Sequence, residues 1–272
     1  MSIPGAAWCY DSQCGAFVPC GGVPVSDRGF RFGMHVFETI ALRRGRLLLG
    51  QIHFDLLDRA CDATGFPPPH RSWLADLANV LVGLPDGIVR IFQTAGDGTP
   101  SAPVAVPRLF AFFEPTEIPT AWPPGGGSAV FCEVPVDDAP WVKSGNYWHH
   151  VRAQQRAIDL NATDAVFVTA DGWILSAAMG NLFVRIEGDL ITPPCGPGVR
   201  PGAVREWLLQ NTTVIERTLH REELSRATEC FLTNSRVGLH PLIRVGDTVF
   251  PEPEGSRALW LHYQREIVDG CS

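Results

Sequence analysis

The chain has 272 residues, 45% of them hydrophobic and 19% charged, and its formal net charge at pH 7 is −7. This composition is typical of a globular protein, and without a basic cluster it argues against nucleic acid as a partner. No apolar run approaches the roughly 20 residues that cross a bilayer, and the first residues lack the features of a signal peptide. We therefore expect a cytoplasmic protein with no membrane partner. The eight cysteines show no zinc-site spacing, so we expect no metal and thiols that are reduced and mostly buried.

The first part of the chain predicts an α+β lobe with two helices packed on a mixed sheet. A glycine-containing turn precedes an alternating apolar strand, and apolar residues then recur at helical spacing in two segments. The expected strands are near 6–25, 36–42, 47–49, 88–94 and 108–113, and the expected helices are 51–64 and 72–82. The Pro- and Gly-rich segment 115–128 predicts a linker between an N-terminal lobe, residues 1–114, and a C-terminal lobe, residues 129–272.

The C-terminal lobe predicts hairpins and helices around a second core. The expected strands are 129–136, 165–169, 173–175, 182–186, 190–192, 214–218 and two that run through 231 and 245, and the expected helices are 147–160, 201–210, 221–226 and 256–268. Asp171-Gly172 is typical of a hairpin turn. Pro201 stands at a first-turn position, where its missing N–H costs little.

Lys143 is the only lysine of the chain, because every other cationic side chain is arginine. Arginine cannot replace the chemistry of a primary amine, since it never deprotonates. An amine in an aromatic-flanked setting can lose its charge by desolvation, after which it can attack a carbonyl or carry a proton. A second interpretation stays open from composition alone, namely a surface lysine that escaped a bias towards arginine.

Six motifs then follow one another in a recognisable order. They are Asp27-Arg-Gly-x-x-Phe-Gly-x-x-Val-Phe-Glu-Thr, His53 at the start of a helix, Val142-Lys-Ser-x-Asn-Tyr, Gly180-Asn-Leu-Phe, Gly198-x-x-Pro-Gly and Leu232-Thr-Asn-Ser. This order resembles the class IV aminotransferase family, whose members are pyridoxal phosphate (PLP) enzymes of fold type IV. The family includes branched-chain and D-amino-acid aminotransferases and aminodeoxychorismate lyase, and the segment with Thr233-Asn-Ser235 is most similar to the lyase branch.

The resemblance implies a two-lobe α+β fold with the site between the lobes, and a homodimer. It implies that Lys143 forms the Schiff base with PLP and then moves protons at the substrate. The implied catalytic residue is Lys143. Tyr147, four residues after the lysine, and His35, in the glycine-containing turn, are further catalytic candidates because of their positions. A half-buried core tyrosine and a hydrogen-bonding turn histidine stay open as alternatives. The implied cofactor-binding residues are Lys143, Ser176, Asn181, Ala203, Val204, Thr233, Asn234 and Arg59. Candidates for holding the substrate, a small carboxylated amine, are Arg28, Phe37 and Arg200.

The sequence departs from the family pattern at three positions that hold PLP. The acid that faces the pyridine nitrogen falls on Ser176, the phosphate-binding arginine falls on Leu56, and a phosphate-binding threonine falls on Val204. A charge-assisted hydrogen bond contributes about 1.5–3 kcal/mol, so the arginine alone accounts for one to two powers of ten in affinity. Arg59, three residues after Leu56, is the expected replacement. A hydroxyl at Ser176 weakens the electron sink and favours elimination over transamination.

Three hypotheses follow. The first is a PLP enzyme of the aminodeoxychorismate lyase or aminotransferase type. The second is a descendant of the fold that has lost PLP and uses Lys143 directly, as a Schiff-base former or a general acid/base. The third is a non-catalytic binding or partner subunit, which would tolerate loss of the Lys143 amine. Fold-level analogy alone does not choose among them.

Overall fold

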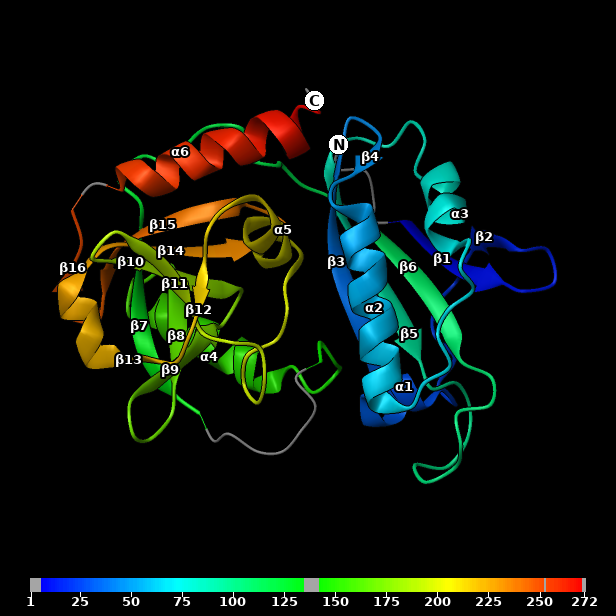
Figure 1. Cartoon of the computed structure of the whole chain (residues 1–272). Coiled ribbons are helices and arrows are strands. Elements are labelled where there is room, and N and C mark those ends of the chain that lie inside the picture. Colours follow the sequence, from blue (N-terminus) through cyan, green and yellow to red (C-terminus); the bar gives the residue numbers. More distant parts are fainter. Residues whose placement is uncertain (1–5, 135–141, 252, 271–272) are drawn as a thin grey trace. The chain divides into compact units, whose positions relative to one another are not determined.

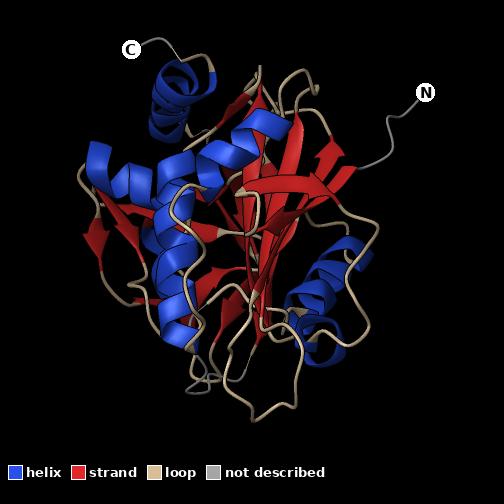
Figure 2. Ribbon diagram, turned by 90° about the vertical axis from the view of Figure 1, so that its right-hand side faces the viewer, coloured by secondary structure: helices blue, strands red, loops and turns tan. Residues whose placement is uncertain are grey.

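The computed structural model describes residues 6–134, 142–251 and 253–270, and this part of the chain forms two compact units (Figure 1). The first unit comprises Met1–Ile118 and Val142–Asn146, and the second comprises Pro119–Trp141 and Tyr147–Ser272. Each unit gathers its strands into a sheet with helices packed against it (Figure 1). Figure 2 distinguishes the helices, in blue, from the strands, in red. Among the described residues, no helix is both long enough and apolar enough to span a membrane.

The first unit is an antiparallel sheet of six strands in the order β2-β1-β6-β5-β3-β4. Its strands are β1 (Ala6–Asp11), β2 (Ala16–Pro19), β3 (His35–Arg43), β4 (Arg46–Leu47), β5 (Gly87–Thr94) and β6 (Arg108–Pro115). Its helices are α1 (Arg28–Phe32), α2 (Gly50–Thr64) and α3 (Trp73–Val80).

The two faces of this sheet differ, because alternate residues of a strand point to opposite sides. On β3, Val36, Ile40 and Leu42 are fully buried in the core that α2 and α3 complete with Leu57 and Trp73. On the other face of β3, His35, Phe37 and Thr39 are half-buried, whereas Ala41 further along the strand is fully buried. That face is where the candidate site of the first unit lies.

The second unit has ten strands among its described residues, in the order β12-β11-β10-β14-β15-β7-β8-β9-β13 with β16 beside β15. The strands are β7 (Gly127–Glu133), β8 (Asp164–Val168), β9 (Trp173–Ala177), β10 (Asn181–Ile186), β11 (Asp189–Thr192), β12 (Ile215–Glu216), β13 (Leu219–His220), β14 (Ala227–Asn234), β15 (Gly238–Val245) and β16 (Thr248–Val249). The helices are α4 (Trp148–Asp159), α5 (Ala203–Asn211) and α6 (Glu254–Tyr263), with a 3₁₀ helix at Arg221–Arg226 and a π-helical turn at Gln264–Val268.

The sheet of the second unit is mixed, since β7 pairs in parallel with both β8 and β15 while β10 and β14 pair antiparallel. One core lies among β7, β8, β10, β14 and β15 and buries Val166, Leu182 and Leu232. A smaller cluster joins α4, through Ala153 and Ala157, to Phe167 of β8. Helix α5 packs against β14.

Most of the predicted elements are confirmed, and the differences have local causes. The glycine-containing turn contains a short helix, α1, because the Asp27 side chain caps its first turn and Gly33 ends it in a left-handed conformation. The strand predicted at 214–218 is instead two short strands, β12 and β13, in different parts of the sheet. The predicted terminal helix changes to a π-helical turn after Tyr263. The end of the strand predicted at 129–136 lies outside the described residues.

The units also differ from the expected lobes. The segment Val142–Asn146 was expected in the C-terminal lobe, but its contacts group it with the first unit. The expected linker 115–128 is shorter in the structure, because β6 extends to Pro115 and β7 begins at Gly127. The division between the units falls between Ile118 and Pro119.

Candidate active site

The segment Lys143–Gly145 pairs antiparallel with residues 35–37 of β3, and this short pairing is called the rung below. The Phe37 N–H donates to the Lys143 carbonyl (2.8 Å), and the Gly145 N–H donates to the His35 carbonyl (3.0 Å). An antiparallel bridge joins Val36 to Ser144 between them. This register sets Lys143 opposite Phe37 and Gly145 opposite His35, on the face of the sheet away from the core. The rung also covers an edge of β3 that β4 leaves unpaired.

The amine of Lys143 lies against an aromatic ring and a hydroxyl. Its Nζ is 4.9 Å from the centroid of the Phe37 ring and donates to Thr39 Oγ1 at 3.1 Å. Both partners follow from the pleat of β3, because residues two apart on a strand share a face. Phe37 in turn stacks on Phe92 of β5, with centroids 5.6 Å apart. The Lys143 side chain is therefore held in one direction over the stacked rings of Phe37 and Phe92.

His35, a predicted catalytic residue, begins the same row of side chains. Its Nδ1 is 3.3 Å from the Gly29 carbonyl, and its ring meets Phe92 edge to face at 5.7 Å. A carbonyl only accepts hydrogen bonds, so this contact assigns the proton to Nδ1 and leaves Nε2 as an acceptor. Burial lowers the pKa of His35, while the Gly29 hydrogen bond and the Asp27 charge oppose that shift. The neutral imidazole can accept a proton at Nε2.

Gly145 is required beside this imidazole. A Cβ on Gly145 would lie 2.6 Å from His35 Cε1 and 2.5 Å from the Gly33 carbonyl oxygen. Real Cβ atoms do not approach a carbonyl oxygen that closely, so any side chain would push the rung away from β3. The glycine therefore determines how near the Lys143 segment lies to His35.

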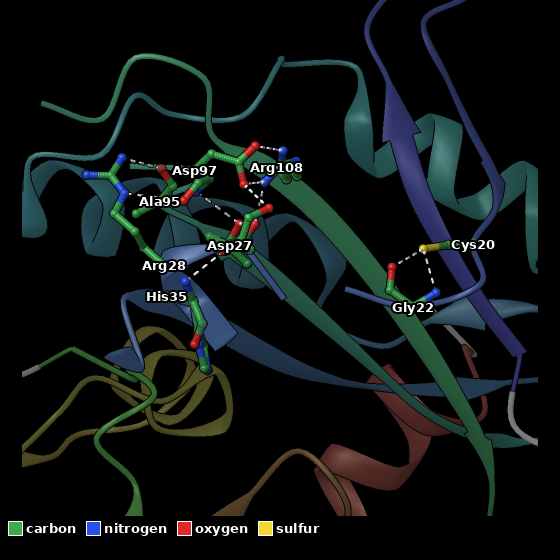
Figure 3. A network of polar contacts seen from close by, with 12 residues as sticks. Cys20, Gly22, Asp27, Arg28, His35, Ala95, Asp97 and Arg108 are labelled. Atoms are coloured by element: carbon green, nitrogen blue, oxygen red, sulfur yellow. Dashed lines mark hydrogen bonds and ion pairs between the residues drawn. The ribbon is translucent and has the colours of Figure 1, made fainter. Parts of the chain in front are cut away.

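A polar network fixes the turn that precedes His35 (Figure 3). Asp27 is fully buried, accepts from the Gly29 N–H (2.7 Å) and from Thr94 (2.8 Å), and pairs with Arg108 at 2.9 Å. Arg108 also binds Asp97 at 2.6 Å, and this hydrogen bond holds the pKa of Asp97 down to about 2. The network ties α1 to the ends of β5 and β6.

Arg28 was predicted as a substrate-binding residue, and the structure corrects this. Its side chain is 1% exposed, and the guanidinium donates to main-chain carbonyls of the loop after β5, including those of Ala95 (2.5 Å) and Ala102 (2.6 Å). Further acceptors are the carbonyls of Gly96, Thr99 and Pro103. A guanidinium committed to these carbonyls holds a loop and is not available to a substrate carboxylate.

In the second unit, two of the residues that the resemblance implied for cofactor binding, Ala203 and Val204, lie at the start of α5. Gly202 precedes this helix without a side-chain cap, so the N–H groups of Ala203 and Val204 open its first turn. Asn181 of β10 donates to the Arg200 carbonyl (2.8 Å), and its Oδ1 lies 2.3 Å from where a Cβ on Gly202 would be. The closely packed glycine and the amide fix the turn that aims these N–H groups.

Thr233 lies across from Asn181 in the β10–β14 ladder and contributes an unusual hydroxyl. The residue is 2% exposed, and its Oγ1 is buried without a hydrogen-bond partner among the described residues. A buried hydroxyl without a partner costs free energy unless a ligand supplies one. The neighbouring Asn234 has a different role, because its Oδ1 accepts from the N–H groups of Arg236 and Val237 and closes the turn to β15.

Tyr147 and Arg200 contact each other in the second unit. Arg200 Nη2 donates to the Tyr147 hydroxyl at 3.2 Å, and the guanidinium lies 5.5 Å from the centroid of the tyrosine ring. The other side of Tyr147 is supported by His150, whose ring stacks at 4.3 Å and whose Nδ1 contacts the Ala178 carbonyl at 2.6 Å. The start of α4 therefore holds a tyrosine beside a half-buried cation.

Ser176 and Asp164 are two buried polar residues of β9 and β8. Ser176 is 4% exposed and Asp164 is 2% exposed. The Asp164 carboxyl accepts from the N–H groups of Ala165 (2.7 Å) and Met179 (3.3 Å). Burial raises the pKa of Asp164 to about 6, against the opposing effects of these N–H groups and of Arg200. This carboxyl supports the turn between β9 and β10.

The helix that was expected to supply a phosphate-binding arginine presents a different arrangement. Leu56 is buried in the core of the first unit, and Arg59 is exposed on α2, with its Nε 3.4 Å from the Asp55 carbonyl one turn earlier. His53 is buried and contacts Glu38 of β3 through Nδ1 at 2.7 Å. This pair anchors α2 to β3 directly behind Phe37 and Thr39, so the role of His53 is structural.

Sequence reasoning did not find Thr39, Gly145 or Asp164. Thr39 was detectable, because it lies two residues after Phe37 on an alternating strand and so shares its face. Gly145 required knowledge of which strand the Lys143 segment pairs with. Asp164 gave no signal beyond one acidic residue at the start of an apolar strand.

The chain is similar to known proteins in sequence and in fold. The model of the family "Amino-transferase class IV" matches residues 35–245. The aminodeoxychorismate lyase of Bacillus subtilis is 25% identical over 260 residues, covering 89% of this chain and 88% of that protein. The D-alanine aminotransferase of Bacillus licheniformis is 24% identical, covering 84% of each. The solved fold IV transaminase of Curtobacterium pusillum superposes with a TM-score of 0.80 at 20% identity, covering 98% of this chain and 99% of that one.

The chain belongs to the class IV aminotransferase family. Its fold is the two-lobe α+β fold of fold-type IV enzymes, as the sequence predicted. The family model spans β3 with Phe37, the Lys143 segment and the strand that ends at Thr233 and Asn234.

Proposed function

We propose that this protein is a PLP-dependent enzyme that acts on a small carboxylated amine by elimination or transamination, with Lys143 as the residue that binds the cofactor covalently. The observation that carries the proposal is the fixed position of the Lys143 amine over Phe37 and beside Thr39. An enzyme amine must be held in one direction to attack a carbonyl repeatedly. The family membership supports the same residue.

The residues at the start of α5 fit the phosphate of PLP. The N–H groups of Ala203 and Val204 lie at a helix N-terminus, where an anion is favoured by the helix dipole. The Thr233 hydroxyl is buried without a partner among the described residues, which is expected of a donor whose acceptor is a ligand. Asn181 and Gly202 hold the turn that presents these donors.

The bound cofactor would supply an electron sink for the substrate carbon. The chain's own residues would hold and move the protons. The Lys143 amine carries a proton to and from the substrate carbon, and Thr39 orients that amine through their hydrogen bond. His35, with Nε2 free to accept, is proposed as a second proton acceptor, and the Phe37 and Phe92 rings exclude water beside it.

We assign the substrate carboxylate to Arg200. Its guanidinium is half-buried in the described structure, and Tyr147 holds it by a hydrogen bond and by the face of its ring. Arginine suits a carboxylate because its donors form a planar fork. Ser176 offers a hydroxyl where the family has a carboxylate, so we propose elimination as the favoured reaction, as in the aminodeoxychorismate lyases. We also propose a cytoplasmic homodimer, as is usual in the family.

The reaction is tested with the purified protein and PLP on the substrates that the relatives' names indicate, aminodeoxychorismate and D-alanine, with and without a 2-oxo acid. Transamination needs an amino acceptor, whereas elimination does not. Consumption of aminodeoxychorismate without an acceptor, lost in Lys143→Ala, supports the lyase. Consumption that requires the 2-oxo acid supports an aminotransferase, and turnover that survives in Lys143→Ala overturns the proposal.

A second candidate is the same fold acting without PLP, with Lys143 as the direct nucleophile or general acid/base. It is favoured by one observation, the burial of the apolar Leu56 at the position where the family has its phosphate-binding arginine. This candidate predicts that activity depends on Lys143 and is unchanged by adding PLP. Such an outcome would separate it from the first proposal.

A further inference from the structure

The cysteines of the first unit are more accessible than the sequence predicted. Of the seven described cysteines, Cys61 and Cys230 are buried, Cys9, Cys20 and Cys132 are half-buried, and Cys14 and Cys195 are exposed. Mostly buried thiols were expected, and that expectation is wrong. Three of the accessible cysteines, Cys9, Cys14 and Cys20, lie in or beside the hairpin of β1 and β2 at one edge of the sheet. Two of these three also share a face.

The register of β1 and β2 brings Cys9 and Cys20 to the same side of the sheet. Cys9 pairs with Val18, and the ladder continues for one more rung because the Cys20 N–H donates to the Ala7 carbonyl at 3.0 Å. Residues directly opposite one another share a face, as do residues two apart on a strand. Cys9 and Cys20 are therefore diagonal neighbours across the pair of strands.

The two thiols also interact with each other. Burial raises the pKa of Cys9, and the charge and hydrogen bonding of the Cys20 thiol raise it further. Cys20 Sγ lies 3.2 Å from the Gly22 carbonyl oxygen and 3.4 Å from the Gly22 nitrogen. Figure 3 shows both contacts as dashed lines. Gly22 thus holds the Cys20 thiol, which lies on the same side of the sheet as the Cys9 thiol.

We propose that Cys9 and Cys20 are a reversible oxidation site, which forms an intrachain disulfide when the protein meets hydrogen peroxide. One thiol is first oxidised to a sulfenic acid as the peroxide O–O bond breaks and one water leaves. The second sulfur then attacks the sulfenic sulfur, and a second water leaves as the S–S bond forms. Two thiols and one peroxide thus give one disulfide and two waters. A dithiol reductant reverses the change.

The backbone around Cys20 can shift far enough for a disulfide with Cys9 to form. Diagonal neighbours have Cα atoms about 7–8 Å apart, and a disulfide needs at most about 6.8 Å, so a shift of about 1 Å suffices. Strand β2 is at the edge of the sheet with only β1 beside it. The residues after Cys20 are Gly21 and Gly22, and a Cβ on either would meet nothing within 4 Å. The chain after Cys20 can move there while Phe17 keeps β2 anchored in the core.

The test uses the full-length protein, reduced and then treated with hydrogen peroxide, alkylated, and digested with an endoproteinase that cleaves before Asp. Cleavage before Asp11 and Asp27 separates Cys9 from Cys14 and Cys20. The Cys14→Ser protein leaves Cys20 as the one thiol in the second peptide. We expect the two peptides to be linked in most chains, to separate with dithiothreitol, and to stay separate in a Cys14→Ser, Cys20→Ser double variant.

Wild-type protein provides the second measurement, because it offers Cys14 as a competitor. In the native state, fragmentation of the linked peptides should place the bond at Cys20, whereas in urea Cys14 should compete. The proposal is overturned if native Cys9 stays alkylated while Cys20 is oxidised alone, or if linkage appears only in urea. It does not depend on the proposed function, so the two can fail separately.

Discussion

Lys143 and Phe37 lie opposite each other in an antiparallel rung, joined by a 2.8 Å hydrogen bond between their main chains and by a 4.9 Å approach of the amine to the ring. The main-chain bond fixes the position of the lysine Cα, and the ring together with Thr39 fixes its amine. Residues that determine this rung should therefore affect activity without contacting a substrate.

Gly145→Ala is expected to displace the rung from β3. The added Cβ meets the Gly33 carbonyl and the His35 ring, and overpacking of this kind costs about 1–3 kcal/mol. We expect a lower free energy of unfolding and a fall in kcat of at least about tenfold, since small misplacements of catalytic groups have large effects. Gly21→Ala is the matched control, because a Cβ there meets nothing within 4 Å. Equal behaviour of the two variants would contradict the importance of the rung.

Thr233→Val should separate cofactor binding from stability. Valine has nearly the shape of threonine, and the hydroxyl it removes has no partner among the described residues. The free energy of unfolding in the absence of PLP should therefore be unchanged, or higher by about 1 kcal/mol. The Kd for PLP, measured by fluorescence titration, should rise about tenfold, and Thr233→Ser should restore it. A large loss of stability in Thr233→Val would show that the hydroxyl has a structural role instead.

Arg28→Met should destabilise the first unit strongly. The substitution leaves buried carbonyls, such as those of Ala95 and Ala102, without donors, and each costs about 1–3 kcal/mol. We expect a loss of more than about 3 kcal/mol in urea unfolding. Arg31→Met, an exposed position in the same helix, is the control and should change stability by less than about 0.5 kcal/mol. Similar losses in both variants would refute the role assigned to Arg28.

Asp164 should make stability fall as the pH rises. Its pKa in the folded protein is raised to about 6 from 3.8, so the folded state holds the proton more tightly than the unfolded state. Its contribution to stability is complete below about pH 3.8 and is lost as the pH rises through 6, by about 3 kcal/mol. The unfolding free energy of wild type minus that of Asp164→Asn should therefore fall from pH 4 to pH 7. A constant difference would contradict this.

The sequence predicted the family and most of the strands and helices along the chain, because these depend on local patterns and on residue identity. It could not place the Lys143 segment on β3, since the amine and Thr39 are 104 residues apart and no periodicity encodes which edge a segment will join. For the same reason the sequence offered Arg28 as a substrate ligand. Only the structure shows that its donors already bind the carbonyls of a loop some 70 residues away.

Covalent binding of PLP by Lys143 can be measured through the visible spectrum of the purified protein with PLP, before and after borohydride, followed by peptide mapping. We expect a coloured complex that reduction fixes on the peptide containing Lys143, and no such adduct in Lys143→Ala. A protein that stays colourless at high PLP, with an unmodified Lys143 peptide after reduction, would contradict it.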